Sequence, residues 1–153
     1  MLNFLKKLFH KPQTSKKEKL ISLGLITVFM LIVGLNKNMT GSSLIFPTLW
    51  MASVLILIVS TYEAWNFYKS ELGRKILIGL FIGNGLLMRI WSELLFSKNV
   101  PESGLFACIG LVIMAELMVI TGFYVNKKSA YMLLPYLGWT LFLTYWNIKL
   151  VTG

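Results

Sequence analysis

Five long apolar runs follow one another along this chain, and they constrain its fold more than any other feature. They cover residues 20–35, 44–65, 76–96, 104–125 and 130–150. A helix needs about 20 apolar residues to cross the hydrocarbon core of a bilayer. Four runs reach that length, and the first, with 16 residues, needs a few flanking residues. The sequence therefore predicts an all-α integral membrane protein, a bundle of five transmembrane helices.

Composition argues against a soluble domain. Hydrophobic residues make up 56% of the chain and charged residues 14%, against roughly a quarter charged in an average soluble domain. A chain of this length buries only about two-thirds of its unfolded surface, so the lipid bilayer has to cover the rest. The single Cys108 and single His10 leave no Cys/His metal site within the chain.

The basic residues predict the orientation. Six lysines lie in residues 1–19, three basic residues in 69–75 and two in 127–128, all on one side of the predicted bundle, whereas the other side holds three. By the positive-inside rule, the N-terminus is cytoplasmic, in a multi-pass protein of a bacterial cell membrane. This clustering between spans is typical of membrane loops, so no nucleic-acid partner is expected despite the formal charge of +9.

The chain divides into a basic tail, residues 1–19, and a membrane domain, residues 20–153. Within the tail, the apolar residues recur at helical spacing; they are Leu2, Leu5, Leu8 and Phe9. Both an interfacial amphipathic helix and a solvated basic tail agree with this pattern.

Three charged residues fall inside the predicted spans: Arg89, Glu93 and Glu116. A charge at bilayer depth costs about 2.5–3.5 kcal/mol on the insertion scale, so these side chains are expected to face the bundle interior and to pair. Arg89 and Glu93 are four residues apart and share a helix face, and Arg89 could reach Glu116 instead. A polar cavity lining and a structural ion pair are both open interpretations.

Tryptophans and asparagines inside the spans are the candidate ligand contacts. Trp65 and Trp146 lie near span ends, as in an interfacial aromatic belt. The others lie deeper, where they could pack helices together or line a flat apolar pocket: Trp50, Trp91 and Trp139. Asn84 and Asn147 allow the same two interpretations. Pro135 is expected to bend or break the start of the fifth helix.

Residues 133–142, LLPYLGWTLF, resemble the fifth helix of the TspO/MBR family of tryptophan-rich sensory and translocator proteins. That helix reads Pro-Tyr-Leu-Ala-Trp, then Phe and Asn, and this chain has Pro135, Tyr136, Trp139, Phe142 and Asn147 in those places, with Gly138 for the alanine.

The resemblance covers residues 46 to 150. Trp91, Ser92, Leu94 and Phe96 resemble the end of the family's third helix, and Trp50 and Trp65 match two tryptophans of its second helix. The family's long first loop, which caps its ligand pocket, is replaced by the short connection 36–43.

The resemblance implies a five-helix bundle, usually a homodimer, with a pocket among helices one, two and five for porphyrins or other flat hydrophobic molecules. Protoporphyrin IX or haem would be the ligand, without covalent attachment, and its role would be transport, sensing or turnover. Trp50 and Trp139 would correspond to pocket tryptophans, with Phe142 beside Trp139. The implied ligand-binding set is Trp50, Asn84, Trp91, Trp139, Phe142 and Asn147.

Other functions remain open from the sequence. Leu141, Tyr145 and Lys149 satisfy a weak sterol-binding pattern. A small-solute transporter would use Glu116 as its coupling carboxylate, and a structural membrane subunit would need no ligand. No nucleophile with a base and no phosphate loop is present, so an enzyme is not expected, although the family has been linked to light-dependent porphyrin breakdown.

Overall fold

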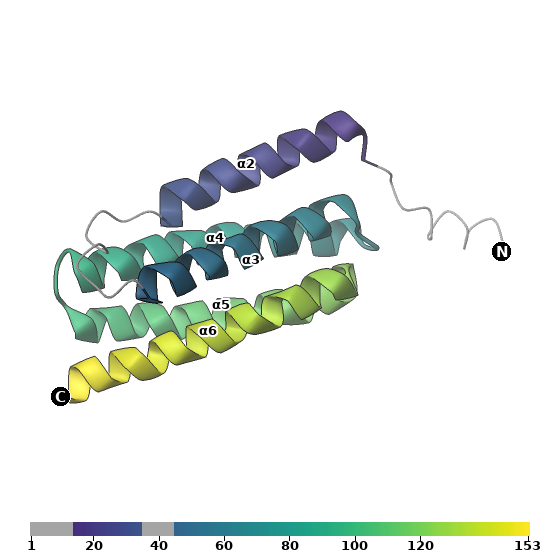
Figure 1. The fold of residues 1–153 in the computed structure, drawn as a ribbon. Coiled ribbons are helices and arrows are strands. Elements are labelled where there is room, and N and C mark those ends of the chain that lie inside the picture. Colours follow the sequence, from purple (N-terminus) through teal and green to yellow (C-terminus); the bar gives the residue numbers. More distant parts are fainter. Residues whose placement is uncertain (1–13, 35–44) are drawn as a thin grey trace.

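The computed structural model describes residues 14–34 and 45–153. These residues form five α-helices and no strand: α2 (Lys16–Gly34), α3 (Ile45–Asn66), α4 (Glu71–Phe96), α5 (Pro101–Val125) and α6 (Lys127–Thr152). The helices lie roughly antiparallel in one bundle (Figure 1). The predicted all-α, five-helix membrane fold is confirmed. The predicted amphipathic segment, Leu2 to Phe9, and the short connection 36–43 lie outside the described residues.

Four helices begin three to five residues before the apolar runs; polar caps start α2, α4 and α6, and Pro101 begins α5. The first helix begins at Lys16, inside the predicted tail. Ser15 and Glu18 form a capping box there: the Ser15 N–H donates to the Glu18 carboxylate, and the Glu18 N–H donates to the Ser15 hydroxyl. Ser70 caps α4 by accepting from the Gly73 N–H, and the Asn126 side chain caps α6.

The helices differ in how apolar they are. Among the described residues, three are long and apolar enough to cross a membrane by themselves: Pro47–Asn66 of α3, and all of α4 and α5. α2 opens with four charged residues in its first turn, and α6 carries three lysines. These two helices therefore depend more on packing against their neighbours.

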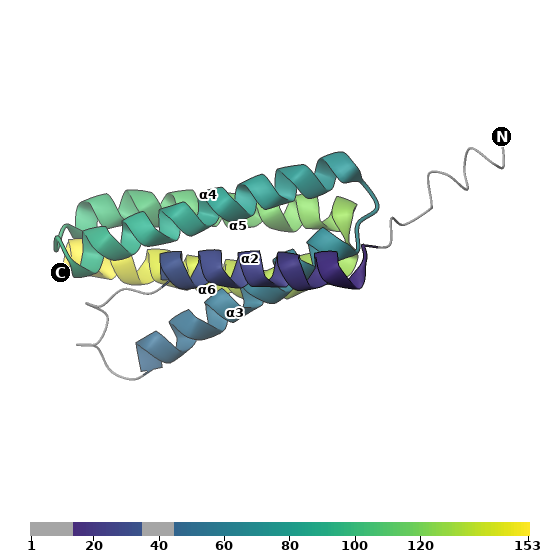
Figure 2. The same ribbon diagram turned by 90° about the horizontal axis from the view of Figure 1, so that it is seen from above.

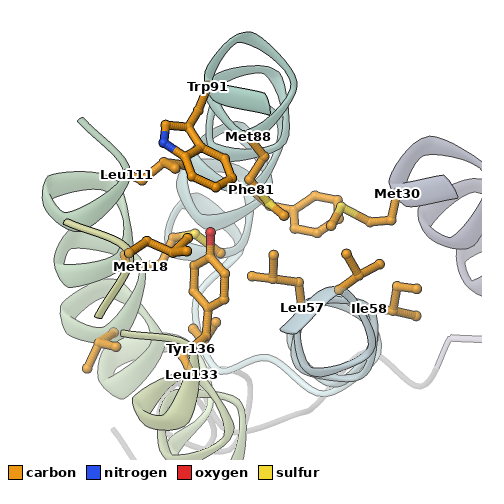
Figure 3. Close-up of a cluster of buried hydrophobic side chains, with 14 of the residues drawn as sticks. Met30, Leu57, Ile58, Phe81, Met88, Trp91, Leu111, Met118, Leu133 and Tyr136 are labelled. Carbon is orange, nitrogen blue, oxygen red and sulfur yellow. The ribbon is translucent and has the colours of Figure 1, made fainter. Parts of the chain in front are cut away.

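Neighbouring helices pack in a definite order. α5 lies between α4 and α6, α3 contacts α6, and α2 lies outside against α3 and α4 (Figures 1 and 2). Large buried side chains fill the centre, among them Met30, Leu57, Phe81, Met118 and Leu133 (Figure 3). The core is therefore built from all five helices.

Polar contacts hold one end of the bundle, where the chain passes from α5 to α6. The hydroxyls of Ser60 on α3 and Ser129 on α6 lie 2.9 Å apart, and each also lies within hydrogen-bonding distance of the other residue's carbonyl. The Lys128 ammonium is 2.6 Å from the carboxylate of Glu63. We call this the basic end, since most of the described lysines and arginines lie here, near the first turns of α2, α4 and α6.

Pro135 lies inside α6, and the helix runs through it from Lys127 to Thr152. The start of the helix is therefore not broken, contrary to one of the two expected effects. Proline has no N–H to donate to the carbonyl four residues before it, which here is the carbonyl of Tyr131.

Candidate functional site

An apolar groove runs along the contact between α3 and α6. Its volume is about 330 Å³, and its lining residues are Leu49, Ala52, Ser53, Ile56, Pro135, Gly138, Trp139 and Phe142. A second hollow of about 350 Å³ shares Ile56 and Pro135 with it and extends past Val59 and Met132. The two form one continuous surface, which we call the α3–α6 groove.

Two aromatic rings make the α6 wall of this groove. The rings of Trp139 and Phe142 stack with centroids 5.4 Å apart and planes 26° from parallel. Trp139 is half-buried, while 48% of Phe142 is exposed. Positions 135, 139 and 142 follow helical spacing and so share one face of α6. The wall is thus a flat aromatic surface at the edge of the bundle.

Gly138 leaves the groove open. Within the described residues, no neighbouring atom lies within 4 Å of the place where a Cβ would stand. The alanine usual in the family would fit there, and a larger side chain would project into the groove. Among the described residues that line the groove, only Ser53 has a side-chain hydroxyl, and this hydroxyl donates to the carbonyl of Trp50 at 2.7 Å. The groove surface is therefore almost entirely apolar.

Trp50 and Trp91 form a separate pair in the core. Their rings stack with centroids 5.2 Å apart and planes 23° from parallel, and both side chains are fully buried. Trp91 also meets the edge of Phe96. The resemblance implied that Trp50 and Trp139 line one pocket together. In the structure Trp139 lines the α3–α6 groove and Trp50 does not. The pairing with Trp91 depends on the contact between α3 and α4.

Asn147 lies fully buried beside this tryptophan pair. With its amide oxygen toward the indole, it accepts from Trp91 Nε1 at 2.9 Å and donates to the Pro101 carbonyl at 3.2 Å, which satisfies both amide atoms. These bonds tie α6 to α4 and to the first residue of α5. The geometry gives Asn147 a packing role at the end of the bundle away from the Lys128 loop.

Asn84 makes a second buried contact between α4 and α6. Its Nδ2 donates to the hydroxyl of Tyr136 at 2.7 Å. Figure 3 shows the Tyr136 ring directed from α6 into the middle of the core. The Oδ1 atom of Asn84 has no hydrogen-bond partner among the described residues. Sequence reasoning listed Asn84 without its partner, because the pairing spans two helices.

The charged residues of the spans do not face the interior, which corrects the sequence prediction. Arg89 Nη2 and Glu93 Oε1 are 3.6 Å apart, as their spacing predicted, but the two side chains are 40% and 49% exposed. Glu116 is also exposed, on the outer surface of α5. Large aromatic and apolar side chains fill the interior positions instead, so the charges lie on the outer face of α4 and α5.

The three residues of the sterol-type pattern lie exposed on the outer surface of α6: Leu141, Tyr145 and Lys149. The Lys149 ammonium lies 5.9 Å from the centroid of the Tyr145 ring. Tyr145 and Lys149 continue the line of Gly138 and Phe142 at helical spacing. Lys149 thus places a cation beyond the aromatic wall of the groove, on the side toward the C-terminus of α6.

Comparison with known proteins found one family and one similar protein. The model of the TspO/MBR family matches residues 35–152. A tryptophan-rich protein TspO of Archaeoglobus fulgidus is 30% identical over 113 residues, which cover 72% of this chain and 71% of that protein.

Proposed function

The chain belongs to the TspO/MBR family, and on that premise we propose that it binds a flat hydrophobic molecule of the tetrapyrrole class in the α3–α6 groove. The observation that carries the proposal is the stacked pair of Trp139 and Phe142, which presents an aromatic face along an apolar groove of about 330 Å³. Ligand pockets typically measure about 300–1,000 Å³ and are mostly apolar with few polar groups.

The aromatic wall supports a planar ligand. A ring system offers a large apolar area and favours offset-stacked or edge-to-face contact with another ring. Trp139 is held by the packing of α6 against α3, so it presents a fixed surface. Since 48% of Phe142 is exposed, a macrocycle lying against the pair would cover apolar area that otherwise contacts lipid tails.

A cation supports a ligand that carries carboxylates, as protoporphyrin IX and haem do. Lys149 follows Phe142 by seven residues, or about 10 Å along the helix axis. At that distance the macrocycle can lie against the aromatic wall while a carboxylate approaches the ammonium. A sterol has no carboxylate, and its hydroxyl would gain less from this cation. The porphyrin is therefore the first ligand to test and the sterol the second.

Filling the groove tests the proposal. Gly138→Phe would place a ring in the groove, and no neighbouring described atom lies within 4 Å of its Cβ position. We expect the dissociation constant for protoporphyrin IX, measured by tryptophan fluorescence quenching in detergent, to rise at least tenfold. Gly79→Phe is the matched control: its Cβ position on α4 is equally open and lies outside the groove. Unchanged affinity in Gly138→Phe would overturn the proposal.

Removing the aromatic wall is the second test. Trp139→Ala should weaken porphyrin binding, whereas Trp146→Ala removes another half-buried tryptophan of α6 that is not in the groove lining. Circular dichroism and gel filtration on both variants would show that the helices remain intact. Equal losses of affinity in the two variants would place the ligand elsewhere.

Self-association and orientation belong to the same proposal. Three exposed charged residues on α4 and α5 are costly against lipid tails: Arg89, Glu93 and Glu116. We infer that a second copy covers this face in a homodimer. The positive-inside rule separately places the N-terminus in the cytoplasm. Chemical cross-linking in membranes should yield a dimer that Glu116→Gln weakens. Cysteine labelling from outside the cell should modify residues near Lys98 and spare those near Lys69.

A further inference from the structure

A second apolar groove lies on a different side of the bundle, where α2, α3 and α4 meet. It measures about 320 Å³ and shares no lining residue with the α3–α6 groove. Leu25 and Phe29 of α2 form one wall, Ile78 and Ile82 of α4 form the opposite wall, and Trp65 of α3 lies between them. Its polar surface is very small, so an apolar chain suits it.

Arg74 lies at the basic end of this groove. It precedes Ile78 by four residues and Ile82 by eight, so the three side chains share one face of α4. Its guanidinium carbon lies 5.8 Å from the centroid of the Trp65 ring and 4.4 Å from that of Tyr68. The guanidinium is thus held beside the groove by two aromatic rings.

The hydrogen bonds of Arg74 leave donor capacity. Its Nη2 lies 2.6 Å from Glu71 Oε1, and its side chain is 18% exposed. Its Nε is buried and has no hydrogen-bond partner among the described residues. A guanidinium has five N–H donors, so the Nη groups of Arg74 can bind a second anion while one of them keeps its bond to Glu71.

Other charges at this end favour an anion overall. Lys19 on α2 lies 4.9 Å from the ring centroid of Phe67. The described charged residues near the ends of α2, α3 and α4 here are Lys16, Lys17, Glu18, Lys19, Glu63, Lys69, Glu71, Arg74 and Lys75. Cations outnumber acids six to three, and Lys128 pairs with Glu63.

We propose that this groove binds an anionic phospholipid, with its phosphate at Arg74 and Lys19 and one acyl chain along Trp65, Ile78 and Ile82. From Arg74 to Ile82 is eight residues, or about 12 Å of helix. That is less than half of a hydrocarbon core of about 30 Å, so the groove binds the part of one acyl chain that is nearest the phosphate. The lipid belongs to the leaflet at the basic end.

Native mass spectrometry of the full chain, with phosphatidylglycerol and phosphatidylcholine of equal chain length, tests the proposal. We expect wild-type protein to retain phosphatidylglycerol at least fivefold over phosphatidylcholine, and Arg74→Gln to bring the ratio close to one. Lys75→Gln removes the same charge from a side chain that is 68% exposed, and should keep most of the preference. Equal losses in both variants would show only general surface attraction and would overturn the site.

The groove itself needs its own variant. Ile82→Trp adds bulk to a groove wall, and Ile90→Trp adds it to a similarly exposed isoleucine of α4 outside the groove; the two are 44% and 49% exposed. Ile82→Trp should lower phosphatidylglycerol retention severalfold, and Ile90→Trp should not. Competition by inorganic phosphate as strong as by the lipid would show an anion site without an acyl chain and would overturn the lipid assignment.

Discussion

Gly122 and Gly138 have opposite surroundings, so Gly138→Ala should stabilise the protein and Gly122→Ala should not. At Gly122, where α5 approaches α6, an ideal Cβ would lie 3.1 Å from Ala130 Cα and 3.2 Å from Ala130 Cβ. These are close contacts with another helix at its backbone, which cannot turn aside as a flexible side chain can. At Gly138, no neighbouring described atom lies within 4 Å of that position.

The magnitudes follow from two terms. Alanine favours a helix over glycine by about 0.8–1.0 kcal/mol, and overpacking costs about 1–3 kcal/mol. Gly138→Ala should therefore stabilise the protein by about 1 kcal/mol. Gly122→Ala gains the same propensity but adds the overpacking, so it should be neutral to about 2 kcal/mol less stable. The two variants should differ by about 1–3 kcal/mol.

Unfolding by SDS in mixed micelles, followed by far-ultraviolet circular dichroism, measures this difference. Both variants are compared with the unchanged protein at one detergent composition, so that the micelle contributes equally. Porphyrin is left out, because a ligand in the α3–α6 groove would stabilise the two variants unequally. Equal stability of Gly122→Ala and Gly138→Ala would refute the close approach of α5 and α6.

The same assay tests three further contacts. Ser60→Ala and Ser129→Ala, singly and together, should show a coupling of about 0.6–1.7 kcal/mol, because the two hydroxyls bond across α3 and α6; additive effects would contradict this. Trp91→Phe keeps an aromatic side chain but removes the N–H that bonds a buried amide oxygen, and should cost about 1–3 kcal/mol; full stability would exclude that bond. Lys128→Met should cost less than about 1 kcal/mol, since its side chain is 62% exposed; a larger loss would mean that its pair with Glu63 is shielded from water.

The number and order of the helices could be predicted because run length alone decides what can cross a bilayer. Helix ends were less predictable. Hydropathy excludes polar residues from a run, yet Ser15, Ser70 and Asn126 begin helices by accepting backbone hydrogen bonds. The first, third and fifth runs therefore begin three to five residues after their helices do, and α5 begins at Pro101, three residues before its run. Cap residues carry this information once they are sought.

The rotation of each helix could not be predicted in the same way. α5 is apolar on nearly every side, so its sequence does not show which face is buried. The cost of a charge in lipid predicts that Glu116 faces inward, and in the structure it faces outward. The pairing of Trp50 with Trp91 likewise depends on a contact between helices, which residue spacing within one helix does not contain.

The candidate groove was predictable in part. The motif around Pro135 indicated that Trp139 and Phe142 matter together, and the structure stacks them. The opposite wall, with Leu49, Ala52 and Ile56, has ordinary apolar residues and no motif. Only the packing of α3 against α6 shows that these residues line a groove.

The connection between α5 and α6 has a consequence for how the protein enters the membrane. Only Asn126 separates the two helices; its N–H donates to the Gly122 carbonyl at 2.7 Å, and its side chain accepts from the Lys128 N–H at 3.0 Å. α6 brings lysines, an asparagine and a proline with it, whereas α5 is strongly apolar. We expect the insertion machinery to release α5 and α6 into the bilayer together, as one helical hairpin. The apolar surface of α5 would then offset the cost of inserting the more polar α6.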